Sequence, residues 1–346
     1  MTHQILTTQN IAKLTQGIDV LEESIRSLDQ KLLEILLFDR TTRKNILWAT
    51  EDYSSNGSEF GEFCEIKPEL VTGQYAALIQ PRVTKSQNAR LGRTRDKAEV
   101  FTPSWICNRQ NNLVDSQWFG RNNVFNVETG ESWTATSGPI SFDGMAKGWQ
   151  KYVDAQRLEI SCGEAPYLVS RYDTVTGEKI PLDQRIGLLD RKMRIVRENT
   201  DTETSWMTWA QRAFESVYGF EYQGDSLLLA RENLLCSYIE YYHERFQRMP
   251  DIPLLCRIAR IISWNIWQMD GLKYVVPGSC KPEEYAQMSL FDYFSDGIFP
   301  VPENEGQCPG CARGDIYRHT GVYCRIMDWR SKCSQTFLSM MKGGNP

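Results

Sequence analysis

Histidine is scarce in this sequence, with only three among 346 residues. His3 lies at the N-terminus, and His243 falls beside two tyrosines in an expected helix, where a structural role is favoured. No pattern of Ser, His and Asp, or of Cys and His, indicates an activated nucleophile. The sequence therefore gives no basis for hydrolytic chemistry, and His319 is left as a candidate metal ligand.

Long apolar runs and an export signal are also missing. No segment approaches the ~20 apolar residues that span a bilayer, and Met1-Thr2-His3-Gln4 lacks the basic and then apolar pattern of a secretory signal. The ten cysteines are therefore expected to be reduced thiols or metal ligands rather than disulfides. The sequence predicts a cytoplasmic protein with no membrane partner.

An excess of basic charge is absent as well, because the net charge is −5. This argues against nucleic-acid binding by bulk electrostatics. Basic residues do gather in one stretch, which is either a solvated face or a contact with DNA phosphates. They are Arg82, Lys85, Arg90, Arg93, Arg95 and Lys97.

The N-terminal region carries an apolar seam whose steps alternate three and four residues, as in a heptad repeat. Two interpretations are open: an amphipathic helix packed on its own domain, or a helix against a partner chain. Just over three heptads is near the lower limit for a coiled coil, which favours the first. The seam residues are Ile11, Leu14, Ile18, Leu21, Ile25, Leu28, Leu32 and Ile35.

Three regions are expected along the chain: a helical or accessory region over 1–90, a central domain over 91–276, and an irregular, cysteine-containing tail over 277–346. In the central domain, short apolar runs alternate with helical stretches, which predicts an α/β fold with a parallel sheet and helices on both faces. Strands are expected at 158–160, 217–221 and 261–267, a long helix at 226–246, and a strand-like run at 75–79.

Possible ligand contacts fall at the ends of these strands. Leu158 to Ala165 is a short strand running into a small-residue turn, which is either a plain turn or a ligand loop. Glu221 ends the next strand, where a carboxylate can accept hydrogen bonds from ribose hydroxyls. Asp270 follows the third strand, in a position suited to an adenine amine.

Four segments, in this order, resemble the adenine-specific DNA methyltransferases of restriction–modification systems. Val100-Phe101-Thr102-Pro103 is similar to the family's Val/Tyr-Phe-Thr-Pro motif, and Leu158-Glu159-Ile160-Ser161-Cys162-Gly163 to its Leu-Glu/Asp-Pro-x-Cys-Gly loop. Tyr218-Gly219-Phe220-Glu221 resembles the ribose-binding strand, and the segment from Asn265 to Leu272 resembles Asn-Ile…Asp-x-Leu. The resemblance covers about half of the chain.

This resemblance implies a Rossmann-like class I methyltransferase sheet, S-adenosylmethionine as cofactor and DNA as partner. It places the Phe-Thr-Pro motif at the methionine end of the cofactor, with Glu221 at the ribose and Asp270 at the adenine. The cofactor-binding residues that it implies are Phe101, Thr102, Pro103, Glu159, Cys162, Gly163, Glu221 and Asp270.

The chain also departs from the family. Glu164 and Ala165 stand where the loop's second glycine is usual, and Glu164 is expected to put a charge near the cofactor. The insertion at 174–213 carries Arg185, Arg191, Lys192, Arg194, Arg197, Trp206 and Trp209. It is either a packed helical cap with a charged face or a surface for DNA backbone and bases.

The main departure concerns catalysis. The family grips a flipped adenine with an Asn/Asp-Pro-Pro-Tyr/Phe loop, and neither Asn-Pro-Pro-Tyr nor Asp-Pro-Pro-Tyr occurs here. Phe291-Asp292-Tyr293-Phe294 supplies an acid and aromatics but lacks the prolines. We therefore expect no catalytic residue in this chain and a partner subunit that supplies the missing parts. The alternative is a non-catalytic scaffold that binds DNA or protein through a degenerate methyltransferase fold.

The tail contains a Cys-x2-Cys pair, Cys308 and Cys311, followed by further cysteines and a histidine. This spacing fits a tetrahedral structural zinc site. The remaining two ligands are either His319 and Cys324 or Cys324 and Cys333. The alternative is a set of reduced, partly buried thiols without metal.

Overall fold

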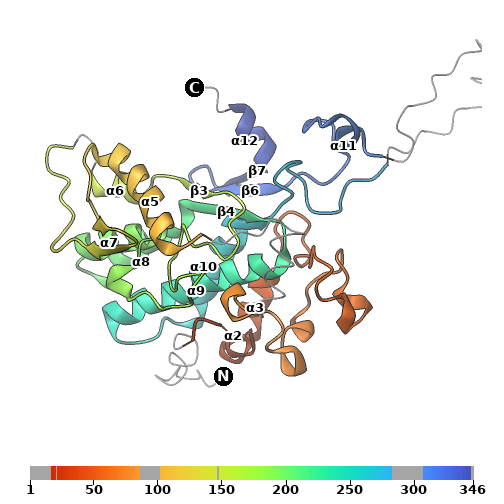
Figure 1. The fold of residues 1–346 in the computed structure, drawn as a ribbon, viewed down its shortest axis with the longest axis horizontal. Helices are drawn as coiled ribbons and strands as arrows, with labels where there is room; N and C mark the ends of the chain where they lie inside the picture. The colour runs from red at the N-terminus through yellow and green to blue at the C-terminus, as the bar shows by residue number, and fades with distance from the viewer. Residues whose placement is uncertain (1–16, 21, 86–101, 146–147, 283–306, 344–346) are drawn as a thin grey trace, which may run out of the picture.

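The computed structural model describes residues 17–20, 22–85, 102–145, 148–282 and 307–343. In these residues the chain is a mixed α/β protein with a short parallel sheet, two antiparallel hairpins and a group of packed helices (Figure 1). Phe101, most of the basic stretch, and Phe291-Asp292-Tyr293-Phe294 lie outside the described residues. Among the residues described, no helix is both long enough and apolar enough to cross a membrane.

The central sheet has three parallel strands in the order β3-β4-β5. They are β3 (Arg157–Glu159), β4 (Val217–Glu221) and β5 (Ile266–Gln268). Glu159 pairs with Gly219, and Phe220 pairs with Trp267. The first two strands lie where the sequence predicts them. The third begins later, because helix continues through Asn265, so the prediction of strand from 261 is wrong.

Helices connect the strands and cover one face of the sheet. The predicted helix at 226–246 is confirmed as α9, which begins two residues earlier. Val217 and Ile266 point into this helical core, in agreement with the alternation of side chains along a strand. The helices are α5 (Ser104–Phe119), α6 (Trp149–Val153), α7 (Leu188–Asn199), α8 (Glu203–Glu215), α9 (Gly224–Phe246) and α10 (Ile252–Asn265). The hairpin β1 (Asn126–Thr129) and β2 (Ser132–Ala135) lies beside α5.

The tail covers the other face of the sheet, where helices of a doubly wound fold were expected. Tyr218, Phe220 and Trp267 pack there in a second core that includes Phe337. The ring centroids of Trp267 and Phe337 are 5.5 Å apart. The tail, expected to be irregular, thus forms four short regular elements within residues 309–343, with irregular backbone between them. Their elements are α11 (Pro309–Arg313), β6 (Arg325–Asp328), β7 (Cys333–Thr336) and α12 (Phe337–Gly343).

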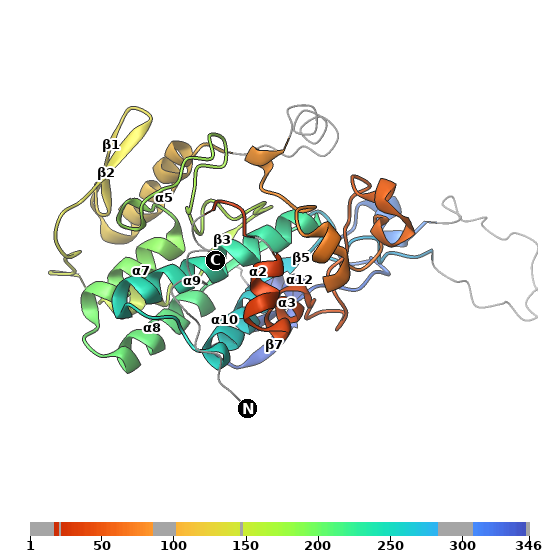
Figure 2. The same ribbon diagram turned by 90° about the horizontal axis from the view of Figure 1, so that it is seen from below.

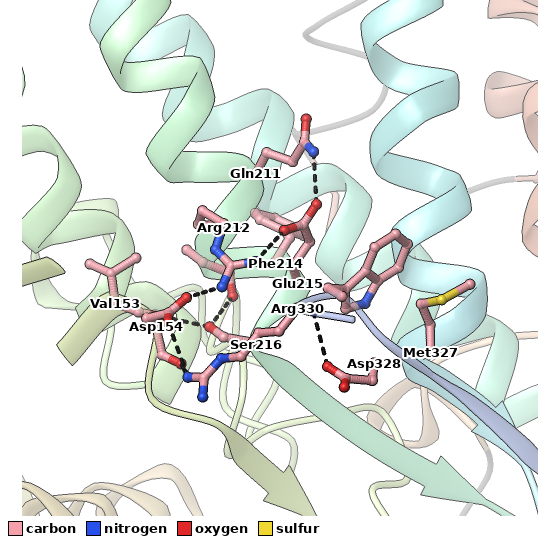
Figure 3. Close-up of polar contacts among 12 residues, drawn as sticks. Val153, Asp154, Gln211, Arg212, Phe214, Glu215, Ser216, Met327, Asp328 and Arg330 are labelled. Atoms are coloured by element: carbon pink, nitrogen blue, oxygen red, sulfur yellow. Dashed lines mark hydrogen bonds and ion pairs between the residues drawn. The ribbon is translucent and has the colours of Figure 1, made fainter. Parts of the chain in front are cut away.

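Polar contacts fasten this tail to the helical side. Arg330 donates to the backbone carbonyl of Asp154 at 3.1 Å and to its carboxylate at 3.0 Å, and Arg212 donates to the same carboxylate (Figure 3). The Trp329 indole donates to the Asn265 amide oxygen at 2.7 Å. Because Asp154 directly follows α6, these contacts join the β6–β7 hairpin to the turn that leads into β3.

The N-terminal seam is buried within this chain. It forms two helices, α2 (Glu22–Leu28) and α3 (Gln30–Leu37), rather than one. The break falls at Asp29, whose backbone is extended and whose carboxylate accepts the N–H of Lys31 at 2.7 Å, which caps α3. Figure 2 shows both helices beside α10, and Ile25 and Leu32 are fully buried. The own-domain interpretation is confirmed from residue 22 onward; Ile11, Leu14 and Leu21 lie outside the described residues.

Short 3-10 turns are the regular elements described between α3 and the basic stretch, and irregular backbone connects them. The expected strand at 75–79 is absent from these described residues, because Gly73–Tyr75 forms a 3-10 turn and irregular backbone follows. The other turns of this kind are Ser54–Asn56, Ser58–Phe60, Pro68–Leu70, Arg82–Thr84 and, further along, Leu182–Gln184.

Arg231 on α9 is a buried cation that joins three segments. Its guanidinium donates to the carbonyl oxygens of Leu36 and Phe38 at the end of α3. It also donates to Ser263 near the end of α10 and to Ile266 in β5. The carbonyls at helix C-termini carry partial negative charge, so this placement offsets part of the cost of burying the charge.

The insertion at 174–213 is part of the core. Arg185 forms an ion pair with Glu240 at 2.5 Å, and Arg191 pairs with Asp115. Lys192 donates to the Ser216 hydroxyl, and Trp206 is buried. These side chains are occupied inside the protein and do not form a DNA surface. The packed helical interpretation is the one that the structure supports.

Candidate functional site

The carboxyl ends of β3, β4 and β5 meet at one edge of the sheet, because the strands are parallel. In open α/β sheets, ligands bind outside this edge. Glu159 and Glu221 end the first two strands, and Asp270 follows the third by two residues. Four of the predicted residues, Glu159, Cys162, Gly163 and Glu221, are brought together here.

One hydrogen bond joins the first two strand ends. The backbone N–H of Gly163 donates to Oε2 of Glu221 at 2.8 Å. The other carboxylate oxygen accepts the N–H groups of Tyr222 at 2.9 Å and Gln223 at 3.2 Å. Burial raises the pKa of Glu221, while these three N–H groups act in the opposite direction. Since a carboxylate has about four acceptor positions, one remains, on Oε2.

The loop after β3 has an unusually tight backbone. Ser161, Gly163 and Ala165 have φ values of 48°, 52° and 62°, which lie in the left-handed region. Ala165 stands where the family has its second glycine, and it keeps that conformation at a cost of about 1 kcal/mol. The loop is also joined to β4 by the N–H of Cys162, which donates to the Phe220 carbonyl at 2.8 Å.

Glu159 supports this loop from inside. Its side chain is buried, and its two oxygens accept the N–H groups of Tyr167 and Leu168, each at 3.2 Å. Burial raises the pKa of Glu159 to about 8 against the lowering effect of these bonds. Glu159 thus shapes the loop from below, and its carboxyl group is not presented to solvent.

Glu164 and Cys162 also point inward. Glu164 is 2% exposed, and its carboxylate accepts the Tyr172 hydroxyl at 2.6 Å and the Arg82 N–H at 2.7 Å. These two bonds hold the Glu164 carboxylate inside the protein, and its place near a cofactor stays a prediction. The Cys162 thiol packs under β4, where a Cβ at Gly219 would lie 3.2 Å from its Sγ. The side chains of Glu159, Cys162 and Glu164 therefore point into the protein, while Ile160 and Ser161 are exposed.

The turn after β5 is organised by Asp270. Its Oδ1 accepts the N–H groups of Leu272 at 3.0 Å and Lys273 at 3.2 Å, and Lys273 Nζ lies 3.1 Å from Oδ2. Leu272 is 86% exposed, and Ile160, after β3, is 70% exposed. Two apolar side chains therefore face solvent at the edge where the strand-end carboxylates lie.

Thr102 and Pro103 lie at the start of α5. The Thr102 carbonyl accepts the Thr174 hydroxyl at 3.2 Å. Pro103 lines a cleft of about 510 Å³ together with Trp105 and Trp133. Their place beside Gly163 and Glu221, which the resemblance implies, stays a prediction.

The described part of the basic stretch is tied to the protein. Lys85 Nζ lies 3.3 Å from the buried carboxylate of Asp225, and the backbone N–H of Arg82 is bonded to Glu164. Asp225 lies in the first turn of α9. Lys85 thus holds this segment against α9. Its positive charge is paired with Asp225 rather than with a DNA phosphate.

A second cluster of chemically active side chains lies in the tail. Four side chains place their ligand atoms within 4.8 Å of one another, so this group could hold a metal ion. They are Cys280, Cys308, Cys311 and His319. Three of the four are predicted from the sequence. Cys324 is buried in the second core, where its Sγ contacts the Gln268 carbonyl at 3.2 Å, and Cys333 is exposed on β7. Neither belongs to the cluster.

Cys280 is the member that sequence reasoning missed. It is a single cysteine far ahead of the Cys-x2-Cys pair, so no local spacing marks it. The signal available was its position directly after Pro277-Gly278-Ser279, a turn that ends the segment following β5.

Comparisons of this chain with protein-family models, with curated proteins and with solved structures find no match.

Proposed function

We propose that this chain binds S-adenosylmethionine at the carboxyl edge of its parallel sheet. We further propose that it is the cofactor-binding subunit of a DNA adenine methyltransferase of a restriction–modification or phage-defence system. In this proposal another chain supplies the loop that grips the base. The observation that carries it is the bond between the Gly163 N–H and Glu221, which brings a tight loop and a strand-end carboxylate together.

The residues at this edge fit the cofactor. Oε2 of Glu221 keeps one acceptor position, enough for one ribose hydroxyl. The left-handed backbone at Gly163 allows a ligand to approach the chain closely. Ile160 and Leu272 offer apolar surface to an adenine ring. When bound, S-adenosylmethionine would supply an activated methyl group; the residues of this chain would bind and orient it.

The choice of DNA adenine as the methyl acceptor rests on the four family-like segments, because a cofactor fold does not fix the acceptor. The second candidate function is a non-catalytic scaffold with a degenerate methyltransferase fold. The observation that favours it is the Glu221 carboxylate, three of whose acceptor positions are already taken by backbone N–H groups.

Calorimetric titration of the purified chain with S-adenosylmethionine distinguishes the cofactor-binding subunit from the non-catalytic scaffold. We expect binding, and Glu221→Gln should weaken it by about 1.5–3 kcal/mol, the cost of losing hydrogen bonds to a charged group. Glu244→Gln, an exposed position near the far end of α9, is the matched control and should bind like the wild type. Absence of heat at saturating cofactor, with a native circular dichroism spectrum, would favour the scaffold.

A further inference from the structure

We infer that Cys280, Cys308, Cys311 and His319 bind one structural zinc ion, which fastens the segment after β5 to the tail. All four ligands come from the described residues. The ligand set differs from both sets that the sequence suggests. Cys280 replaces Cys324 in the first set, and Cys280 and His319 replace Cys324 and Cys333 in the second. The inference is independent of the proposed cofactor.

The distances match a tetrahedral zinc centre. His319 Nδ1 lies 3.7 Å from Cys280 Sγ, 3.6 Å from Cys308 Sγ and 3.6 Å from Cys311 Sγ. Zinc binds sulfur at about 2.3 Å and imidazole nitrogen at about 2.0–2.1 Å, so a tetrahedral angle places these atoms about 3.6 Å apart. The three nitrogen–sulfur separations thus match those that the metal requires, and all four ligand atoms lie within 4.8 Å of one another.

The backbone around the cluster is built for this close approach. A Cβ at Gly310 would lie 2.6 Å from the His319 backbone nitrogen and 2.7 Å from its Nδ1. A Cβ at Gly321 would lie 2.7 Å from Ser279 Oγ and 3.0 Å from Cys280 Sγ. A side chain at either position would push a ligand away, which explains glycine at both.

The surroundings also suit a metal-bound thiolate. The Thr320 N–H donates to Cys308 Sγ at 3.2 Å, as outer-shell donors do for thiolate ligands. Three sulfurs and one imidazole form a set that favours zinc over calcium or magnesium, which prefer oxygen. Because protein atoms fill all four positions, none is left for water or substrate, and the site is structural rather than catalytic.

The metal would join two segments that are distant in the sequence. Cys280 and Cys308 lie on either side of residues 281–307, and hydrogen bonds join the same two segments. The Thr320 hydroxyl bonds with the backbone of Lys281, and the Val276 N–H donates to Val322 at 2.9 Å. Since Tyr274 and Cys324 are also bonded, the site supports the turn that carries Asp270.

Metal content of the full chain, purified under reducing conditions without a histidine tag, tests the inference. Plasma mass spectrometry should find about one zinc per chain, as for other four-ligand sites. Cys280→Ser and Cys308→Ser should each lose the metal, and Cys333→Ser, an exposed cysteine of the same tail, should keep it. Retention of zinc by Cys280→Ser, or its loss from Cys333→Ser, would overturn the ligand assignment.

Cobalt substitution of the wild type keeps the test valid if the ligand variants fail to fold. Co²⁺ added to the chelator-treated chain should give a thiolate-to-cobalt absorption band, and Zn²⁺ should displace it stoichiometrically. A wild-type chain that contains no zinc and develops no such band contradicts the inference. A further readout is thermal unfolding, in which chelation should lower the midpoint of the wild type and leave that of Cys280→Ser unchanged.

Discussion

The carboxyl group of Glu159 lies inside the protein, beneath the loop that follows β3. Two backbone N–H groups donate to it. Folding raises its pKa from 4.5 to about 8, so the folded chain holds this proton more tightly than the unfolded chain does. The stability that this provides is full below pH 4.5 and is lost as the pH rises through about 8. The stabilising contribution of Glu159 to the free energy of unfolding is therefore low at neutral pH and lowest at mildly alkaline pH.

Glu159→Gln should remove this pH dependence, because glutamine resembles the protonated carboxyl group. Between pH 5.5 and 8.0, the Glu159 contribution to the free energy of unfolding should fall by about 3 kcal/mol in the wild type, at about 1.4 kcal/mol per pKa unit. Urea denaturation at both values measures it. Glu244→Gln is the control and should keep the wild-type dependence. If Glu159→Gln and the wild type lose the same free energy across this range, Glu159 is ionised in the folded protein.

Single residues show what sequence could and could not predict. The predicted position of Glu221 at a strand end is confirmed, and its role toward a ribose stays a prediction. The inward turn of Glu164 depends on Tyr172 and Arg82, and no sequence pattern announces those partners. Cys280 was missed for the same reason, since its ligand partners come from a segment remote along the chain.

Among the elements, prediction succeeded where the pattern was long. Helix α9 was found almost to the residue, because 23 residues without a proline leave few alternatives. The border between α10 and β5 was misplaced because Ile261 and Ile262 belong to an apolar run that fits a strand or a buried helix equally well. The heptad seam indicated burial correctly, yet it did not show that Asp29 interrupts it.

The start of α9 gives a test of how closely these elements pack. A Cβ at Gly224 would lie 1.9 Å from the Leu47 carbonyl oxygen, which Gln268 holds by a hydrogen bond of 2.8 Å. Gly224→Ala should therefore destabilise the chain by about 2–3 kcal/mol, as other overpacked cores are destabilised. Chemical denaturation measures the loss. Gly61→Ala, where φ is −68° and the nearest atom would be 3.5 Å away, should change little. Equal midpoints for the two variants would contradict the packing described here.

At the scale of the whole molecule, the sequence indicated an α/β protein, and the structure has one. The second face of the sheet could not be foreseen. The apolar side chains on that face alternate along the strands, and any element could cover them; they are Tyr218, Phe220 and Trp267. The element that covers them is the tail around Phe337, whose sequence shows no regular pattern. Such an element is hard to predict because its local periodicity is weak and distant contacts stabilise it.

The isolated chain should not methylate DNA. Methyl transfer to an adenine amine requires a base outside the stack and fixed oxygens that accept its amine hydrogens. Incubation with radiolabelled S-adenosylmethionine and varied double-stranded DNA should leave the DNA unlabelled, while addition of a partner that carries Asn-Pro-Pro-Tyr should give labelled adenine. Labelling of adenine by the purified chain alone would show that it contains its own base-binding loop.

Arg231 has a consequence for how the protein is made. The carbonyls of α3 that it binds precede it by as many as 195 residues, and α10, which also packs on α3, comes later still. The apolar sides of α2 and α3 are therefore synthesised before α9 and α10, the two long helices that pack on α3. Arg325, whose backbone N–H donates to the Thr41 hydroxyl at 2.9 Å, joins β6 to the turn that follows α3. Assembly of this part of the core therefore depends on contacts between residues far apart in the sequence, which makes folding slow compared with that of a chain dominated by local contacts.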